Sequence, residues 1–354
     1  MAGVPVLARC CRAAFAALVV AREEIDALNV YPVPDADTGT NLVRTMDAAC
    51  RALDGQVEDR LGGPADVGTH LHRVARAAMI GACGNSGIIL AQFLHGAARA
   101  LDGRRVLDGP ALARALAAAS AAGYDAVERP VEGTILTVAR AAAEAATRRA
   151  AESGPTPAAV LSAATGAAEA ALADTTQQLD PLRRAGVVDA GGCGFVVVLE
   201  AFAAVLVGQP TRSTGQPARP TALAGPTAPR AVAKAVTPTV ARPRAAPSPA
   251  SYAAPTGLAY EVTYLVDAAD AAIAGLRASL SSLGECLVVS GGEGLWHIHV
   301  HVDDATAAVD AGASAGRPRQ IRITRLDGGQ AGGDCAPGLP RSASYAGRTR
   351  RVAR

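Results

Sequence analysis

Apolar residues recur every three or four positions through the first 207 residues, and this spacing constrains the fold more than any other feature. Leu42, Met46, Ala49 and Leu53 follow it in one stretch, as expected for one face of an α-helix. The helical stretches lie at about 4–28, 42–53, 66–80, 88–98, 110–122, 134–152, 156–174 and 191–206. Ala, Val and Leu supply most of the apolar content and aromatic residues only 3% of the chain, a composition that suits packed helices. The sequence predicts an all-α N-terminal domain, an antiparallel bundle or barrel of about eight helices.

Beyond residue 207 the composition changes twice. Residues 208–256 hold ten of the 22 prolines, which predicts a disordered linker between an N-terminal domain, 1–207, and a second domain. Residues 257–326 show strand and helix patterns in the order β-α-β-β-α-β, typical of a small ferredoxin-like α/β domain. Residues 327–354 are Gly-rich and then basic, which predicts a disordered tail rather than a nucleic-acid-binding arm.

Charge and cysteine usage narrow the class of protein. The net charge of +2 gives no field that would attract nucleic acid or an anionic membrane. The seven cysteines are scattered and never form a CxxC pair, which fits a reducing cytosol. We expect no stretch to reach the ~18 apolar residues that span a bilayer, and therefore a soluble, cytoplasmic protein without stable membrane insertion.

Two acidic residues stand two positions apart in the segment NVYPVPDADTGTN, residues 29–41. Asp35 and Asp37 follow two prolines that stiffen the loop, and Mg²⁺ prefers one or two carboxylates together with substrate phosphates. The helix that follows would begin with hydroxyls and backbone N–H groups, where the helix dipole favours phosphate, at Thr38, Gly39, Thr40 and Asn41. On composition alone, an Asp N-cap beside a solvated Asp explains the pair equally well.

Three histidines alternate along a predicted strand of the second domain. His297, His299 and His301 share one face, because side chains alternate along a strand, and three imidazoles would suit zinc. For an anonymous strand, a solvated face with incidental histidines is the favoured interpretation.

Four ordered segments resemble motifs of the DhaL (dihydroxyacetone kinase L, DAK2) superfamily, in its fatty acid kinase A branch. The acidic segment resembles PVPDGDTGTNM. Residues 81–90, GACGNSGIIL, resemble GARGNSGVIL; residues 130–138, PVEGTILTV, resemble PVEGTMLTV; and residues 186–194, GVVDAGGCG, resemble GVVDAGGQG. Residues 257–326 are similar to the middle domain of the same kinases.

The resemblance implies a helical barrel that binds ATP and two Mg²⁺ ions at one end. Asp35 and Asp37 would be the catalytic metal ligands, and Asn29 stands near the place of a third aspartate in dihydroxyacetone kinases. The residues expected to bind the nucleotide are Thr38, Gly39, Thr40, Asn41, Gly84, Asn85, Ser86, Gly133, Thr134, Asp189, Gly191 and Gly192. In the second domain, His299 and His301 match a histidine pair that joins a cysteine in a metal site, with Glu261 in the place of the cysteine; Zn²⁺ would bind there.

Three departures from the family pattern bear on activity. Ala36 replaces the glycine between the two aspartates, at a cost on the order of 1 kcal/mol if the position needs positive φ. Cys83 replaces the arginine of the second motif. The relatives continue into a DegV-like C-terminal domain, which is expected to be lacking here because the sequence becomes Gly-rich after Leu326.

The expected function is that of an ATP- and Mg²⁺-dependent kinase subunit. It would phosphorylate a fatty acid, presented by a DegV-like fatty-acid-binding carrier protein, to an acyl phosphate. Two alternatives stay open: a glycerone (dihydroxyacetone) kinase-like activity, and a non-catalytic nucleotide-binding scaffold or regulator. The sequence also leaves a homodimer open.

Overall fold

The computed structural model describes residues 3–54, 66–208 and 258–326. The predicted linker, from residue 209 on, and the predicted tail lie outside the described residues. The helices of the first part are α1 (Val4–Leu28), α2 (Thr38–Asp54), α3 (Val67–Gly81), α4 (Gly84–Ala100), α5 (Gly109–Ala126), α6 (Ile135–Ala150), α7 (Pro157–Gln178), α8 (Asp180–Ala185) and α9 (Ala190–Val207).

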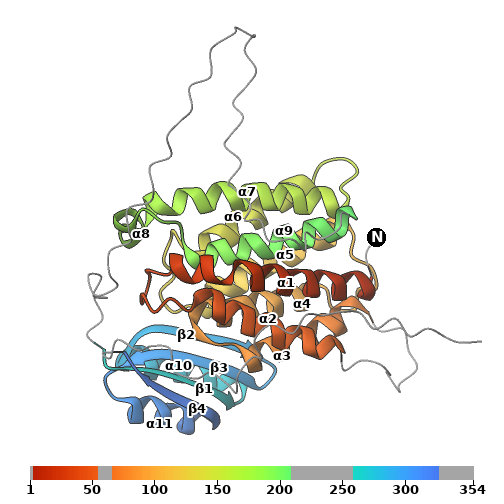
Figure 1. Ribbon diagram of the computed structural model, residues 1–354. Helices are drawn as coiled ribbons and strands as arrows, with labels where there is room; N and C mark the ends of the chain where they lie inside the picture. Colours follow the sequence, from red (N-terminus) through yellow and green to blue (C-terminus); the bar gives the residue numbers. More distant parts are fainter. Residues whose placement is uncertain (1–2, 55–65, 209–257, 327–354) are drawn as a thin grey trace, which may run out of the picture.

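The long helices close into a ring. Each of α1 to α7 packs against the next in sequence, α7 packs against α9, and α9 returns to α1. Figure 1 shows these helices side by side, with α1, α7 and α9 running along one another. The predicted helical barrel is thereby confirmed. The short helix α8 was not predicted, because its six residues are too few to display a period of 3.6.

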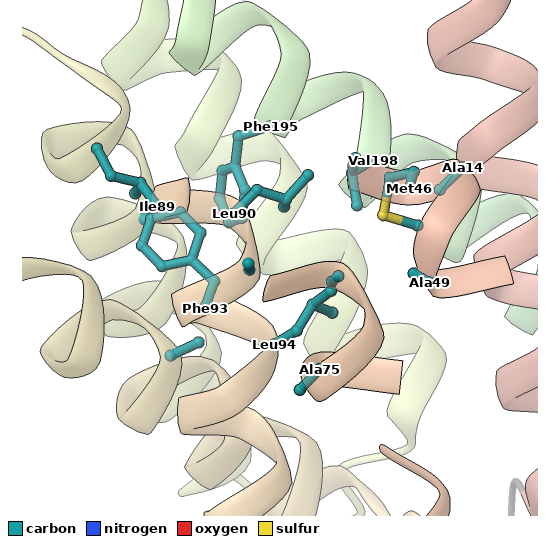
Figure 2. Packing of buried hydrophobic residues seen from close by; sticks show 14 of the residues in the cluster. Ala14, Met46, Ala49, Ala75, Ile89, Leu90, Phe93, Leu94, Phe195 and Val198 are labelled. Atoms are coloured by element: carbon teal, nitrogen blue, oxygen red, sulfur yellow. The ribbon is translucent and has the colours of Figure 1, made fainter. Parts of the chain in front are cut away.

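Small and aromatic side chains line the interior of the barrel, around an apolar cavity of about 120 Å³. The rings of Phe93 and Phe195 meet edge to face with centroids 5.2 Å apart, and Met46 and Leu90 lie in the same core (Figure 2). Alanines such as Ala14, labelled in the same view, let neighbouring helices approach closely. Because the helices turn mostly apolar side chains toward this interior, the polar residues of the candidate site come from the loops and helix starts at one end of the barrel.

Two helices correct the expectation about membrane spans. Helices α1 and α9 are long and apolar enough to cross a bilayer by length and composition, and their most apolar windows are 22% and 50% buried in the protein. Both helices also pack within the barrel: α1 contacts α2 and α9, and α9 contacts α1, α6 and α7.

The second domain is a four-stranded antiparallel sheet with two helices. Its elements are β1 (Tyr260–Asp267), a 3₁₀ turn (Asp270–Ala272), α10 (Ile273–Leu283), β2 (Gly284–Gly292), β3 (Leu295–Val302), α11 (Ala305–Ala315) and β4 (Arg317–Arg325). The strand order is β2-β3-β1-β4, which confirms the predicted ferredoxin-like pattern. Val262, Ile298 and Val300 pack on the helices of this domain in a core of their own.

The opposite face of the sheet lies against the helical barrel. Figure 1 shows the sheet beneath α2 and α3, with α11 on the far side. On β3, His297 Nδ1 is 2.8 Å from the carbonyl oxygen of Met79 at the end of α3. On β2, the hydroxyl of Ser290 and the amide of Gly291 both donate to Gln92 Oε1 of α4, over 2.8 and 3.0 Å. These contacts place the histidine strand at the mouth of the barrel.

Candidate functional site

The acidic loop between α1 and α2 is held in shape by its own side chains. Asn29 Nδ2 donates to Asp35 Oδ1 over 2.5 Å, and the amide of Asn41 donates to the carbonyl of Asp37 over 2.8 Å, which starts α2. Between the aspartates, Ala36 has φ 55°. This is the left-handed conformation that glycine adopts freely and that costs alanine an amount on the order of 1 kcal/mol. The conditional expectation about this substitution is met.

The start of α4 faces this loop. Gly84 has φ 58°, and a Cβ at this position would lie 2.3 Å from Asn41 Nδ2, so glycine is required both by its dihedral and by the close approach of α2. Asn85 and Ser86 follow in the first turn, and Asn85 Oδ1 is buried without a hydrogen-bond partner among the described residues. A buried, unpartnered acceptor beside helix-terminal N–H groups fits a site for a hydrated cation with its phosphates.

The second domain completes a small acidic cavity of about 40 Å³ at this place. From the barrel it is lined by Asn29, Tyr31, Pro32, Val33, Asp35, Asp37, Thr38, Asn41, Gly84, Asn85 and Ser86, and from the second domain by Glu261, His299 and His301. The sequence treated the aspartate pair and the histidine pair as separate sites in separate domains. The structure brings both into one cavity.

The carboxylates of the cavity disfavour one another's ionisation. Burial raises the pKa of Asp35 to about 8, helped by the charge and hydrogen bond of Asp37 and by the charge of Glu261. Burial also raises the pKa of Glu261 to about 7, with further contributions from Asp37 and Cys83. Close, buried carboxylates of this kind are stabilised in ionised form by a bound cation, and the donor set of carboxylate and amide oxygens matches what Mg²⁺ prefers.

The histidine pair has the spacing of metal ligands. His299 Nε2 and His301 Nε2 lie 3.1 Å apart, and Glu261 Oε2 lies 3.8 Å from His301 Nε2. Two nitrogens bound tetrahedrally to zinc, each at about 2.0–2.1 Å, are separated by about 3.3 Å, so the observed pair fits such an ion. Burial lowers the pKa of His301 to about 4, which leaves the neutral imidazole that a metal requires.

The favoured interpretation of this strand face as solvated is wrong. His297, His299 and His301 are 6%, 1% and 1% exposed, because the face lies against the barrel. His297 is separated from the other two by its contact with Met79. The ring Nδ1 atoms of His299 and His301 have no hydrogen-bond partner within the described chain.

A larger cavity of about 270 Å³ adjoins the acidic one. The two share Tyr31, Pro32, Asn85 and Ser86. One wall of the larger cavity is the connection between α5 and α6 and the first turn of α6. The opposite wall is the start of β2, which joins that connection by a bridge between Val127 and Val288.

The two walls are tied together by main-chain bonding. The amide of Glu128 donates to the carbonyl of Leu287 over 3.0 Å, next to Cys286, whose φ of 54° marks the bulge in β2. The cavity volume is close to the lower end, about 300 Å³, of ordinary small-molecule sites. Its lining combines apolar side chains with the charged residues Glu128, Arg129, Asp189 and Glu285. It shares residues with the acidic cavity, which suits a nucleoside with its phosphates directed toward Asp35 and Asp37.

Asp189 lies in the lining of the larger cavity at the start of α9. Its Oδ2 accepts the Gly192 amide over 2.7 Å, and Gly191 lies beside it in the lining. Burial raises the pKa of Asp189 to about 6, against the lowering effect of the amides of Gly192 and Ile135. This carboxylate therefore caps α9 and anchors it to α6, while it borders the cavity.

The structure brings most of the predicted site residues to the two cavities. Those in the linings are Asn29, Asp35, Asp37, Thr38, Asn41, Gly84, Asn85, Ser86, Thr134, Asp189, Gly191, Glu261, His299 and His301. Within the described chain, four other predicted residues line neither of these two cavities: Gly39, Thr40, Gly133 and Gly192.

Those four residues support the packing and turns of the elements that carry the site. The amide and hydroxyl of Thr40 both donate to Asp26 of α1, each over 2.9 Å. A Cβ on Gly39 would lie 2.3 Å from the carbonyl oxygen of Arg22, so the glycine lets α2 approach α1. Gly192 similarly faces the packed side chains of α6 and α7, and Gly133, at φ 82°, turns the chain into α6.

Sequence reasoning missed the residues that β2 contributes. Cys286, Leu287 and Val288 line the larger cavity, but nothing in their local pattern distinguishes them from an ordinary apolar strand. Tyr31 borders both cavities and could have been found, since it lies inside the proline-flanked motif and is its one aromatic residue.

Comparison with known proteins agrees with this arrangement. Residues 32–204 match the DAK2 domain family, and residues 257–331 match the FakA-like family, the middle domain of fatty acid kinase A-like proteins. Protein YloV of Bacillus subtilis is 41% identical over 185 residues, which cover 52% of this chain and 32% of that protein. An uncharacterized protein of Staphylococcus saprophyticus is 37% identical over 185 residues, with the same coverage.

A solved structure is also similar. The dihydroxyacetone kinase from C. freundii, in complex with AMP-PNP and Mg²⁺, superposes with a TM-score of 0.43 and 22% identity over 57% of this chain and 34% of that one. The matches to the curated relatives span about a third of their length, 32%.

A DAK2 domain followed by a FakA-like middle domain marks the chain as a kinase-family protein. The chain belongs to the DhaL/DAK2 superfamily, in the fatty acid kinase A branch.

Proposed function

We propose that the chain is the ATP-dependent subunit of a fatty acid kinase. It would transfer the γ-phosphoryl group of ATP to the carboxylate of a fatty acid presented by a separate DegV-like carrier protein, giving an acyl phosphate. The observation that carries the proposal is the single cavity in which Asp35, Asp37 and Glu261 meet the first turns of α2 and α4. The fatty acid as substrate is supported by the match of the second domain to FakA-like middle domains.

The described residues divide the work between the two cavities. The larger cavity would hold the nucleoside between the α5–α6 connection and β2. Asn85, Ser86 and the amides of the first turn of α4 would bind the phosphates, and Asp35 and Asp37 would hold magnesium. Magnesium, when bound, neutralises phosphate charge. The protein contributes to catalysis by positioning the reacting groups and excluding water, as in most enzymatic phosphoryl transfer.

Glu261, His299 and His301 would hold a zinc ion beside this site. Their ligand atoms all lie within 4.8 Å of one another, and they come from β1 and β3, which pair directly opposite each other. All three ligands belong to the second domain, so such an ion would be held by that domain and would face the acidic loop. It would also add positive charge to a cavity rich in carboxylates.

The decisive experiment compares substitutions of Asp37, which directly precedes α2, and of Asp47, which lies within α2. Asp37→Asn should weaken Mg²⁺-dependent ATP binding by at least about tenfold, since it removes a charged metal ligand. Asp47→Asn is the matched control, because Asp47 pairs with Arg51 on the surface of α2 and should leave binding unchanged. Calorimetry with and without Mg²⁺ measures the affinity for ATP. A separate elemental analysis of the same preparations and of His299→Ala tests for bound zinc. Unaltered ATP binding by Asp37→Asn contradicts the metal assignment.

Turnover then separates the candidate activities. We expect ADP and acyl phosphate to form when the full chain is mixed with ATP, Mg²⁺, a fatty acid and a purified DegV-like carrier. Omission of the carrier should abolish the formation of both products. Consumption of ATP with dihydroxyacetone in place of the fatty acid would favour the glycerone kinase alternative. Nucleotide binding without turnover under any of these conditions would favour the scaffold.

A further inference from the structure

An arginine from the second domain reaches the start of α4. In the sheet, Arg322 of β4 pairs with Thr263 of β1, and Thr263 pairs with His299 of β3. Directly paired residues share a face of a sheet, so Arg322 lies on the face that His299 presents to the barrel. Its Nη1 is 4.0 Å from the sulfur of Cys83, the residue that precedes Gly84 and caps α4.

A second arginine approaches the same cysteine from the barrel. Arg44 lies on α2, one turn after Asn41. Burial raises the pKa of the Cys83 thiol, whereas the charges of Arg44 and Arg322 and a hydrogen bond from Arg44 act in the opposite direction. The charge of Asp37 also acts on this thiol. Two guanidinium groups from different domains therefore lie near Cys83. Neither lines the acidic cavity, but Gly84, the next residue after Cys83, does.

This position suits an anion that is being transferred. In the proposed site, the carboxylates of the cavity bind cations and the N–H groups of α4 bind phosphates. When the carboxylate of the acceptor approaches the phosphoryl group, two negatively charged groups repel each other. Guanidinium groups are planar forks that bind carboxylate and phosphate oxygens bidentately. A pair of them at the border of the phosphate site would offset that repulsion where it arises.

We propose that Arg322, flanked by Arg44, neutralises the phosphoryl group during its transfer to the acceptor carboxylate. This proposal rests on the proposed kinase function and names the residues that act at its chemical step. In that step an oxygen of the carboxylate forms a bond to the γ-phosphorus, the bond from phosphorus to the bridging oxygen breaks, and ADP leaves with the electron pair. No proton and no oxidant is required. The second domain is thereby a contributor to catalysis as well as a cover for the site.

The test uses the full chain with Arg322→Gln and Arg322→Lys. Arg319→Gln is the matched control, because Arg319 lies on the same strand and is paired with Asp267 at 2.9 Å. Two quantities are measured: kcat and KM for ATP in the carrier-dependent assay, and the affinities for Mg·AMP-PNP and Mg·ADP by calorimetry. Arg322→Gln should lower kcat by about a hundredfold, as loss of one charge-stabilising donor does, and should abolish any preference for the triphosphate analogue. Its affinity for Mg·ADP should stay within about twofold of wild type, because the group acts beyond the β-phosphate.

The outcomes separate this proposal from the proposed function. No turnover by the wild-type chain refutes the kinase activity, while the comparison of Mg·AMP-PNP with Mg·ADP still tests the arginine site. The proposal is overturned if Arg322→Gln keeps both kcat and the triphosphate preference, or if the wild type shows no such preference. If Arg322→Gln lowers the melting temperature, Arg322→Lys and Arg44→Gln decide. A full kcat in both of these variants also overturns it, since a lysine cannot reproduce the fork.

Discussion

The methyl group of Ala36 strains the backbone of the acidic loop. The residue's φ of 55° is held by neighbours on both sides, since Asp35 is bonded to Asn29 and Asp37 starts α2. Ala36→Gly should therefore raise the free energy of unfolding by about 0.5–1 kcal/mol, because glycine adopts this conformation without strain. Denaturant unfolding of the full chain measures it.

The control for this prediction is Ala16→Gly. Ala16 is an exposed residue within α1, where glycine should lower stability by about 0.5–1 kcal/mol. Equal destabilisation by both substitutions would show that Ala36 is not strained in the folded protein.

The motifs predicted which residues lie at the site, but not which neighbours each of them contacts. Asp35, Asp37 and Asn85 were predicted at the site and line a cavity there. Thr40 was predicted to contact phosphate, yet its hydroxyl and amide are both taken by Asp26. A short polar residue at the start of a helix serves equally well as a ligand or as a bridge to a neighbouring helix, and only the position of α1 decides between them.

At the scale of elements, close packing of small residues makes the barrel possible. A Cβ on Gly123 in α5 would lie 2.1 Å from the ring of Phe93, which is itself packed against Phe195. Gly123→Ala should cost about 1–3 kcal/mol, because the added methyl group would overpack this contact. Gly166 in α7 is exposed and has open space around the position of a Cβ, so Gly166→Ala should stabilise by about 0.5–1 kcal/mol.

Thermal unfolding of the two variants beside wild type measures this contrast. Both substitutions remove one glycine from a helix and add one methyl group, so propensity alone predicts the same gain for each. A gain in Gly123→Ala would mean that the α4–α5 contact is loose enough to accept the methyl group.

Helices and strands with a regular apolar spacing could be predicted from the sequence. The burial of a strand face that packs against the other domain could not. The long helices and the four strands follow from spacing alone. The face of β3 that carries His297, His299 and His301 has the alternation of a half-exposed strand, and the sequence favoured solvent as its neighbour. Its burial comes from contact with the end of α3 and with the acidic loop, more than 200 residues away along the chain, and no local pattern records such a contact.

At the scale of the whole molecule, the site exists because the two domains meet. One cavity takes its aspartates from the barrel and takes Glu261 and its histidines from the sheet, and the other takes a wall from each domain. Sequence motifs identified both halves, since each is contained in a short segment. Their union depends on docking contacts made by residues outside the motifs, such as Gln92 and Ser290, and was therefore not foreseen.

Docking of the second domain should thus control nucleotide affinity, and Gln92→Met tests this. The substitution keeps the size of a buried side chain but removes the acceptor of the Ser290 hydroxyl and the Gly291 amide, a loss worth about 1–3 kcal/mol. Hydrogen exchange at the Gly291 amide should accelerate, and Mg·ATP affinity should fall at least about fivefold as β2 withdraws from the larger cavity. Gln177→Met, on the exposed surface of α7, should change neither. Faster exchange with unchanged affinity would show that the nucleotide binds to the barrel alone, because the wall formed by β2 would then contribute nothing to binding.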